Sequence, residues 1–173
     1  MLDLLRKNNI VAGVLAVFRI YLGYQFLHAG FGKVTGGVFD ASGFLQGAIA
    51  SSTGDHPAVQ GWWAAFLEHF ALPNAGLFTF LVQWGEVLVG IALILGLFTN
   101  FATIMGMLMN FAFLFSGTVS TNAQMVLLAI FVVVAGANAG KFGLDRFAMP
   151  YIKNFIANKT NKTNKSKKDP AVV

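Results

Sequence analysis

The apolar segment from which the fold class follows is IVAGVLAVFRIYLGYQFLHAGFGKV, residues 10–34. It exceeds the roughly 20 residues that a helix needs to cross the hydrocarbon core of a bilayer. An apolar segment near the N-terminus is also typical of a cleaved signal peptide. Here Arg19 interrupts the apolar run and no clear A-x-A cleavage site follows, so we interpret the segment as a retained membrane helix.

The composition of the whole chain supports a membrane protein. Of the 173 residues, 56% are hydrophobic and 11% are charged, whereas a soluble domain carries about 25% charged residues. Disorder over most of the chain is disfavoured, because it requires low hydrophobicity and high charge. The chain has no Cys, so it supplies no disulfide, thiolate metal site or dithiol redox couple.

Three further apolar segments follow, and the sequence predicts an all-α integral membrane four-helix bundle. The predicted membrane domain covers residues 10–147, with spans at about 10–34, 74–97, 101–115 and 123–139. The short connections between the last three spans favour antiparallel neighbours.

The long loop between the first two spans, residues 35–73, contains two short segments, Phe39–Ala50 and Ala58–Phe70. Two interpretations of the second segment stay open. Its two Trp residues favour a helix lying along the membrane surface, because Trp is enriched at that interface. A small cap packed on the ends of the spans is the alternative.

Charge is distributed unevenly along the chain. Residues from Lys141 onward include eight basic and two acidic residues, whereas the first 140 residues include four basic and five acidic residues. Basic residues beside spans mark the cytoplasmic side. We therefore predict a multi-pass protein of the bacterial cytoplasmic membrane, with residues 1–9 and both termini in the cytoplasm and residues 35–73 outside.

Residues 148–173 are predicted to form an interfacial segment and then a disordered basic tail that contacts anionic lipid. The apolar residues of the interfacial segment include Tyr151, Phe155 and Ile156, with Lys153 and Lys159 facing water. Asp145 is the expected N-cap of this last segment. No folded basic face accompanies the tail, so nucleic-acid binding is not expected.

Ionisable residues at membrane depth are costly and mark candidate functional sites. At 1.5 Å per residue, Arg19 lies roughly 14 Å and Glu86 roughly 16 Å from the inner edge, which predicts an Arg19–Glu86 pair. Gln83 and Asn110 would complete this polar cluster, and Lys33 is a borderline third charge. Three interpretations stay open: a structural ion pair, a ligand site for a quinone carbonyl or a small anion, and a proton relay. No metal site is expected.

Three stretches resemble the signatures of one family, the DoxX/DoxD-like membrane proteins. The first is R-x-x-L-G-x-x-F-x-x-x-G-x-x-K at residues 19–33. The second joins Glu86 and Gly90 to LGLFT at residues 95–99, and the third covers residues 136–145. The resemblance extends over about residues 10–147.

The resemblance implies a four-helix bacterial inner-membrane protein and carries Arg19, Lys33 and Glu86 over as site positions. Family members include the small subunit of thiosulfate:quinone oxidoreductase, so a quinone-linked redox role is the expectation. Quinone would be the ligand and a soluble or membrane redox subunit the partner. The alternatives are a non-enzymatic anchor or assembly subunit, and a small-solute transporter acting as a homodimer.

Overall fold

The structure, a computed structural model, describes residues 2–37 and 39–168 and confirms the predicted all-α class, with no β-strand in these ranges. The α-helices are α1 (Leu2–Lys7), α2 (Asn9–Thr35), α3 (Ala41–Ala50), α4 (Gly61–Phe66), α5 (Ala75–Leu95), α6 (Thr99–Phe115), α7 (Asn122–Ala135) and α8 (Asp145–Lys168). A π-helical turn (Leu67–Ala71) and a 3₁₀ turn (Leu72–Asn74) join α4 to α5, and a second 3₁₀ turn (Gly136–Asn138) follows α7.

Two helical stretches are long and apolar enough to cross a membrane. One is α2, and the other is the uninterrupted stretch Gly61–Leu95 that includes α5. The apolar helices α6, with 17 residues, and α7, with 14, are shorter. The four helices agree closely with the predicted segments, but the second continues upstream through the π and 3₁₀ turns into α4.

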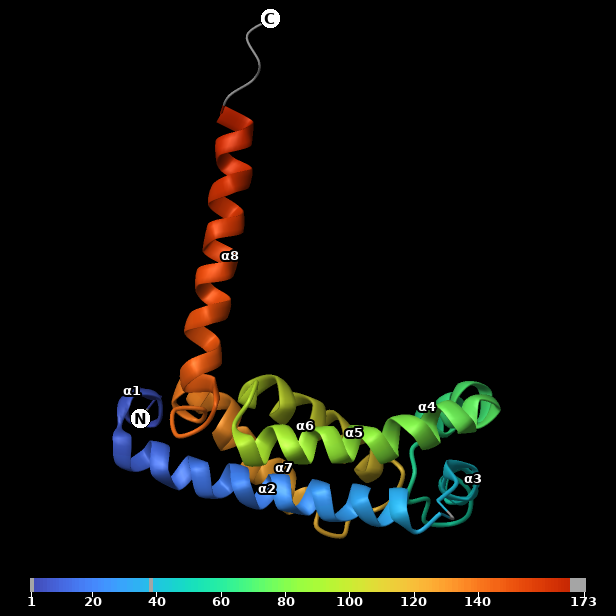
Figure 1. Cartoon of the computed structure of the whole chain (residues 1–173). Coiled ribbons are helices and arrows are strands. Elements are labelled where there is room, and N and C mark those ends of the chain that lie inside the picture. Colours follow the sequence, from blue (N-terminus) through green and yellow to red (C-terminus); the bar gives the residue numbers. More distant parts are fainter. Residues whose placement is uncertain (1, 38, 169–173) are drawn as a thin grey trace, which may run out of the picture.

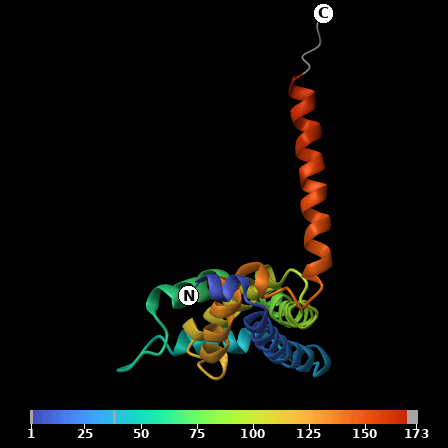
Figure 2. The same ribbon diagram turned by 90° about the vertical axis from the view of Figure 1, so that its left-hand side faces the viewer.

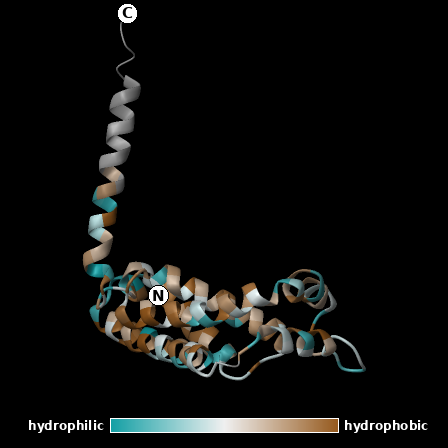
Figure 3. Ribbon diagram, turned by 45° about the vertical axis from the view of Figure 1, so that its right-hand side comes forward, coloured by the Kyte–Doolittle hydropathy of each residue, from teal (hydrophilic) through white to brown (hydrophobic). Residues whose placement is uncertain are grey.

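Helices α2, α5, α6 and α7 pack together into one bundle, and α2 runs alongside α5 over most of its length (Figure 1). Apolar residues dominate these helices (Figure 3). The core consists of apolar residues from all four: Leu15, Leu22, Phe26, Val89, Leu93, Ala102, Met125, Ala129 and Val132.

The two ends of the bundle are built differently. At one end, which we call the terminal end, lie α1 and the start of α8 (Figure 1). There the Asn138 side chain donates hydrogen bonds to the carbonyls of Leu5 (2.8 Å) and Asn8 (3.0 Å). Arg6 Nε donates to the carbonyl of Val134 at 3.1 Å. These bonds attach the first residues of the chain to the end of α7.

At the other end, the cap end, α3, α4 and the π turn form a small cap. The cap has an apolar core of its own, which consists of Ala41, Leu45, Ala48, Val59, Ala64, Leu67 and Ala71. Two hydrogen bonds tie it to the bundle: Ala41 N donates to Thr79 Oγ1 (2.9 Å), and Trp63 Nε1 donates to Ser116 Oγ (2.9 Å). Residues 58–70 are thus packed against α3 and tied to the end of α6.

Glycines bring α2 and α5 into close contact. A Cβ added at Gly90 would lie 2.6 Å from the backbone nitrogen of Leu27, and one added at Gly30 would lie 2.7 Å from that of Val87. A Cβ added at Gly23 would lie 2.9 Å from the backbone nitrogen of Ile94. Small residues allow two helix backbones to approach this closely, so these three positions fix the register of the two antiparallel helices.

Helix α8 starts at the terminal end and points away from the bundle in two perpendicular views (Figures 1 and 2). It continues to Lys168. The prediction of a disordered tail is therefore wrong up to Lys168, because the Lys- and Asn-rich repeat extends the helix that begins at Asp145. Residues 169–173 and the side chains of Ile156 and Lys159 lie outside what the structure describes.

We predict that Gly90→Ala destabilises the fold, because the added methyl group overlaps the backbone of Leu27. Overpacking of this kind costs about 1–3 kcal/mol. Thermal unfolding in mild detergent measures the effect. Gly13→Ala is the matched control, since a Cβ at Gly13 of the same helix pair has no atom within 4 Å. Equal melting temperatures for the two variants would contradict a register fixed by glycine.

Candidate functional site

An ion pair between α2 and α5 lies at the cap end of the bundle. Lys33 Nζ is 2.6 Å from Glu86 Oε2. The Glu86 side chain is only 3% exposed, while that of Lys33 is 25% exposed. Gln83 Nε2 donates to the backbone carbonyl of Lys33 at 3.0 Å, and the Lys33 ammonium lies 5.4 Å from the centre of the Phe39 ring. These contacts hold Lys33 at the mouth of the site and Glu86 at its floor.

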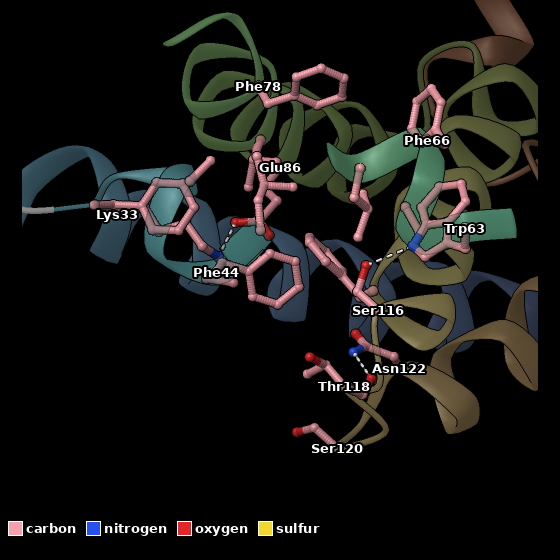
Figure 4. Close-up of a pocket in the computed structure, with 18 residues that line it drawn as sticks. Lys33, Phe44, Trp63, Phe66, Phe78, Glu86, Ser116, Thr118, Ser120 and Asn122 are labelled. Carbon is pink, nitrogen blue, oxygen red and sulfur yellow. Dashed lines mark hydrogen bonds and ion pairs between the residues drawn. The ribbon is translucent and has the colours of Figure 1, made fainter. Parts of the chain in front are cut away.

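The pair opens onto a pocket of about 310 Å³ between the bundle and the cap. Helices α2, α5 and α6 supply one side, and the cap supplies the other. Figure 4 shows the Lys33–Glu86 pair on one side of the pocket and Trp63 and Phe66 on the other. Six aromatic side chains line it: Phe39, Phe44, Trp63, Phe66, Phe78 and Phe113. An apolar pocket with a few convergent polar groups is the usual form of a small-molecule site.

A second, more polar crevice of about 270 Å³ borders Glu86. Gln25, His28 and Asn110 line it, and the two cavities share Glu86 and Phe113 as walls. The Asn110 side chain is 1% exposed, and its Nδ2 has no hydrogen-bond partner among the described residues. Glu86 thus separates an aromatic pocket from a crevice whose walls can hold water.

The arrangement offers no obvious metal centre. No group of three or more His, Asp and Glu residues comes together in the described ranges 2–37 and 39–168. The Lys33–Glu86 pair itself offers hydrogen-bond donation from an ammonium and proton exchange at a carboxylate.

The predicted Arg19–Glu86 pair is wrong, because Glu86 pairs with Lys33. Arg19 is buried at the terminal end, where its Nη2 donates to the carbonyl of Phe142 at 3.4 Å. Its guanidinium lies against Gly96, which has a φ of +65°, and against Gly143. Within the described part of the chain, Arg19 Nε and Nη1 have no hydrogen-bond partner.

Arg19 does not reach Glu86 because α2 and α5 are offset along their axes. The depth estimate placed residues 10 and 97 at one level, whereas the glycine contacts place Arg19 beside Gly96. About ten residues of α2 therefore project beyond the end of α5, or roughly 15 Å of helix. Of the predicted cluster, the structure brings together Lys33, Glu86 and Gln83, with Asn110 across the crevice, and leaves Arg19 apart.

Asp145 closes the end where Arg19 lies. Its carboxylate accepts hydrogen bonds from the backbone nitrogens of Phe98 (2.7 Å) and Thr99 (2.9 Å). The expectation that Asp145 caps the last helix is wrong in detail, because Asp145 is the first residue of α8 and its side chain caps α6. Phe98, which precedes α6, supplies no capping side chain of its own. A carboxylate at a helix N-terminus satisfies free N–H groups and complements the helix dipole.

The sequence did not reveal the aromatic lining of the pocket. Phe44, Trp63 and Phe66 come from the cap, and their approach to Glu86 depends on how the cap folds back. The density of aromatic residues between residues 39 and 70 was the available signal. It does not by itself distinguish a pocket wall from a membrane-surface helix.

We predict that Lys33→Met destabilises the protein, since it leaves the buried Glu86 carboxylate without its partner, and that Glu86→Gln has a smaller effect, since the unpaired Lys33 ammonium is 25% exposed. Breaking a buried ion pair from one side costs about 3–5 kcal/mol. The double variant should retain more stability than the sum of the two single effects predicts. Thermal unfolding of all four proteins in detergent gives the coupling energy, and additive effects would show that the two charges do not interact.

We also predict that Asp145→Ala destabilises the terminal end, because it removes both acceptors for the α6 N-terminus. Loss of hydrogen bonds to a charged group costs about 1–3 kcal/mol. Hydrogen exchange at the start of α6, followed by mass spectrometry, should show faster exchange there. Asp55→Ala, at an exposed position in the cap, is the control and should leave exchange in α6 unchanged.

Comparison with protein-family models matches residues 14–119, more than half of the chain, to the family described as DoxX. The matched region contains α5, α6 and nearly all of α2, together with Lys33 and Glu86. No curated protein and no solved structure matches the chain.

Proposed function

This chain belongs to the DoxX family, and on that premise we propose that the pocket beneath the cap binds the ring of a quinone. The family and the two long apolar stretches together indicate a membrane protein. The proposed role is a membrane subunit in quinone-linked redox chemistry. The observation that carries the proposal is the buried Lys33–Glu86 pair beside an aromatic pocket.

The proposed orientation places the pocket at the outer surface of the bacterial cytoplasmic membrane. In this arrangement α2, α5, α6 and α7 cross the bilayer, and both termini are cytoplasmic. The distribution of charge supports it. The acidic residues Asp40, Asp55 and Glu68 lie in the cap segment, whereas basic residues of α1 and α8 lie at the terminal end. Basic residues concentrate on the cytoplasmic side of membrane proteins.

The pocket suits an amphipathic planar ligand. A quinone ring can stack on aromatic side chains such as Phe66 and Trp63, which are already stacked on each other with ring centres 5.0 Å apart. The partly exposed Lys33 ammonium has N–H groups that Glu86 does not use, and one of them can donate to a ring carbonyl. The isoprenoid tail would leave toward the lipid.

Glu86 gives the proposed site a route for protons. Reduction of a quinone to a quinol takes up two electrons and two protons. As the carboxylate of the ion pair, Glu86 can take up a proton through the crevice lined by His28 and Asn110 and pass it to the reduced ring, and a second transfer by the same route supplies the second proton. The electrons would come from a sulfur-containing reductant or a partner subunit at the outer surface. Two thiosulfate ions joined as tetrathionate, for example, release two electrons.

We predict that a short-chain ubiquinone analogue quenches Trp fluorescence of the purified protein, and that Trp63→Phe abolishes most of the quenching. Of the three Trp residues, Trp63 is the one that lines the pocket. Lys33→Met should weaken binding roughly tenfold or more, because it removes a charge-assisted hydrogen bond of about 1.5–3 kcal/mol. Lys7→Met, at an exposed position of α1, should bind as the wild type does.

If the ubiquinone analogue quenches Trp fluorescence of Trp63→Phe and Lys33→Met as it does that of the wild type, the proposed site is wrong. Thiosulfate-dependent quinone reduction by the same protein then tests the redox role. Quinone binding without reduction would identify a subunit that requires a partner for electron supply. Absence of both binding and reduction, with helical content intact, would favour the non-enzymatic anchor.

A further inference from the structure

A separate pocket, of about 560 Å³, lies at the terminal end, far from the site beneath the cap. Its walls are the first residues of α6, the 3₁₀ turn after α7 and the first turns of α8. Three cations line it: Lys141, Arg146 and Lys153. They come from two separate elements, so the fold itself gathers them around one cavity.

One acidic residue, Asp145, lines the same pocket, but its carboxylate is already engaged. It accepts from the backbone nitrogens of Phe98 and Thr99 at 2.7 and 2.9 Å. The ion pairs found within residues 2–37 and 39–168 are Lys7–Asp3 and Lys33–Glu86. The three cations of the pocket therefore have no carboxylate partner in the described part of the chain.

The other contacts of these cations are weak or neutral. Lys141 Nζ donates to the side-chain oxygen of Asn9, and the Arg146 guanidinium lies 6.0 Å from the centre of the Phe147 ring. The side chains of all three are exposed at the pocket. In addition, Asn100 Oδ1 is buried at the pocket wall, with no hydrogen-bond partner in the described residues. The pocket thus offers three positive charges and one free acceptor.

An apolar stripe on α6 begins in the pocket and runs toward the cap end. Its exposed members recur at helical spacing: Phe101, Ile104, Leu108, Phe111 and Phe115. Phe101 is 64% exposed and itself lines the pocket. Residues three and four apart share one face of a helix, so the stripe forms a continuous apolar surface that starts at the cationic pocket.

We propose that this pocket binds the phosphate head group of an anionic phospholipid whose acyl chains lie along the α6 stripe. Basic pockets beside membrane helices on the cytoplasmic side bind anionic head groups. Helix α8 leaves the bundle at this end (Figures 1 and 2), and its residues Arg146 and Lys153 line the pocket together with the first residues of α6. The apolar stripe is the feature that distinguishes a lipid from a free phosphate ion. The site is independent of the ligand beneath the cap.

The test is binding of phosphatidylglycerol to the full-length protein in detergent, measured by native mass spectrometry. The pocket variant carries Lys141→Gln, Arg146→Gln and Lys153→Gln. Each basic residue near an anionic head group is worth roughly fivefold in affinity, so the variant should bind roughly a hundredfold more weakly. The control variant removes the same charge further along the chain, with Lys162→Gln, Lys165→Gln and Lys167→Gln, and should bind nearly as the wild type does.

Two comparisons separate a lipid from other anions. A phosphatidylglycerol with six-carbon chains should bind more weakly than one with eighteen-carbon chains, and inorganic phosphate at the same concentration should not displace the lipid. If the two triple variants lose the same affinity for phosphatidylglycerol, the binding depends on the total charge of the chain and not on this pocket, and the proposed site is overturned. Displacement by inorganic phosphate would overturn the lipid assignment, and circular dichroism of each variant excludes unfolding as the cause.

Discussion

The close approach of α2 and α5 through Gly23, Gly30 and Gly90 is the constraint on which the other features depend. It brings the two backbones together and leaves no room for a different register. Because the helices are antiparallel, that register decides which charged residue of α2 meets Glu86. It places Lys33 opposite Glu86 and Arg19 beside Gly96, so the two cations belong to opposite ends of the bundle.

Lys33 and Arg19 are accommodated between the helices in different ways. Lys33 has a carboxylate partner and remains partly exposed at a pocket. Arg19 has no hydrogen-bonded carboxylate in the described residues and lies against two glycines, near the carboxylate of Asp145 that caps α6. An Arg guanidinium stays charged even when buried. Arg19 contacts the α5–α6 turn and the segment before α8, whereas Lys33 lines the pocket beneath the cap.

The helices were predictable because each is a long apolar segment bounded by turn residues, and the predicted spans end within a few residues of α2, α5, α6 and α7. The charged residues Arg19, Lys33 and Glu86 could also be identified from the sequence, since each interrupts an apolar run. Their pairing was not, because it depends on the axial offset of α2 and α5, and no local pattern records an offset. The aromatic walls contributed by the cap, such as Trp63, depend in the same way on a tertiary contact, here with Ser116.

The same register argument bears on whether the Lys33–Glu86 pair serves only to fix packing. A buried ion pair is a costly way to specify a helix interface, and apolar replacements of similar volume are often as stable or more stable. Here three glycine contacts already fix the register over the length of the interface. The ion pair is not needed for register, lies between an aromatic pocket and a polar crevice, and keeps its ammonium partly exposed. These three features support the ligand site proposed above.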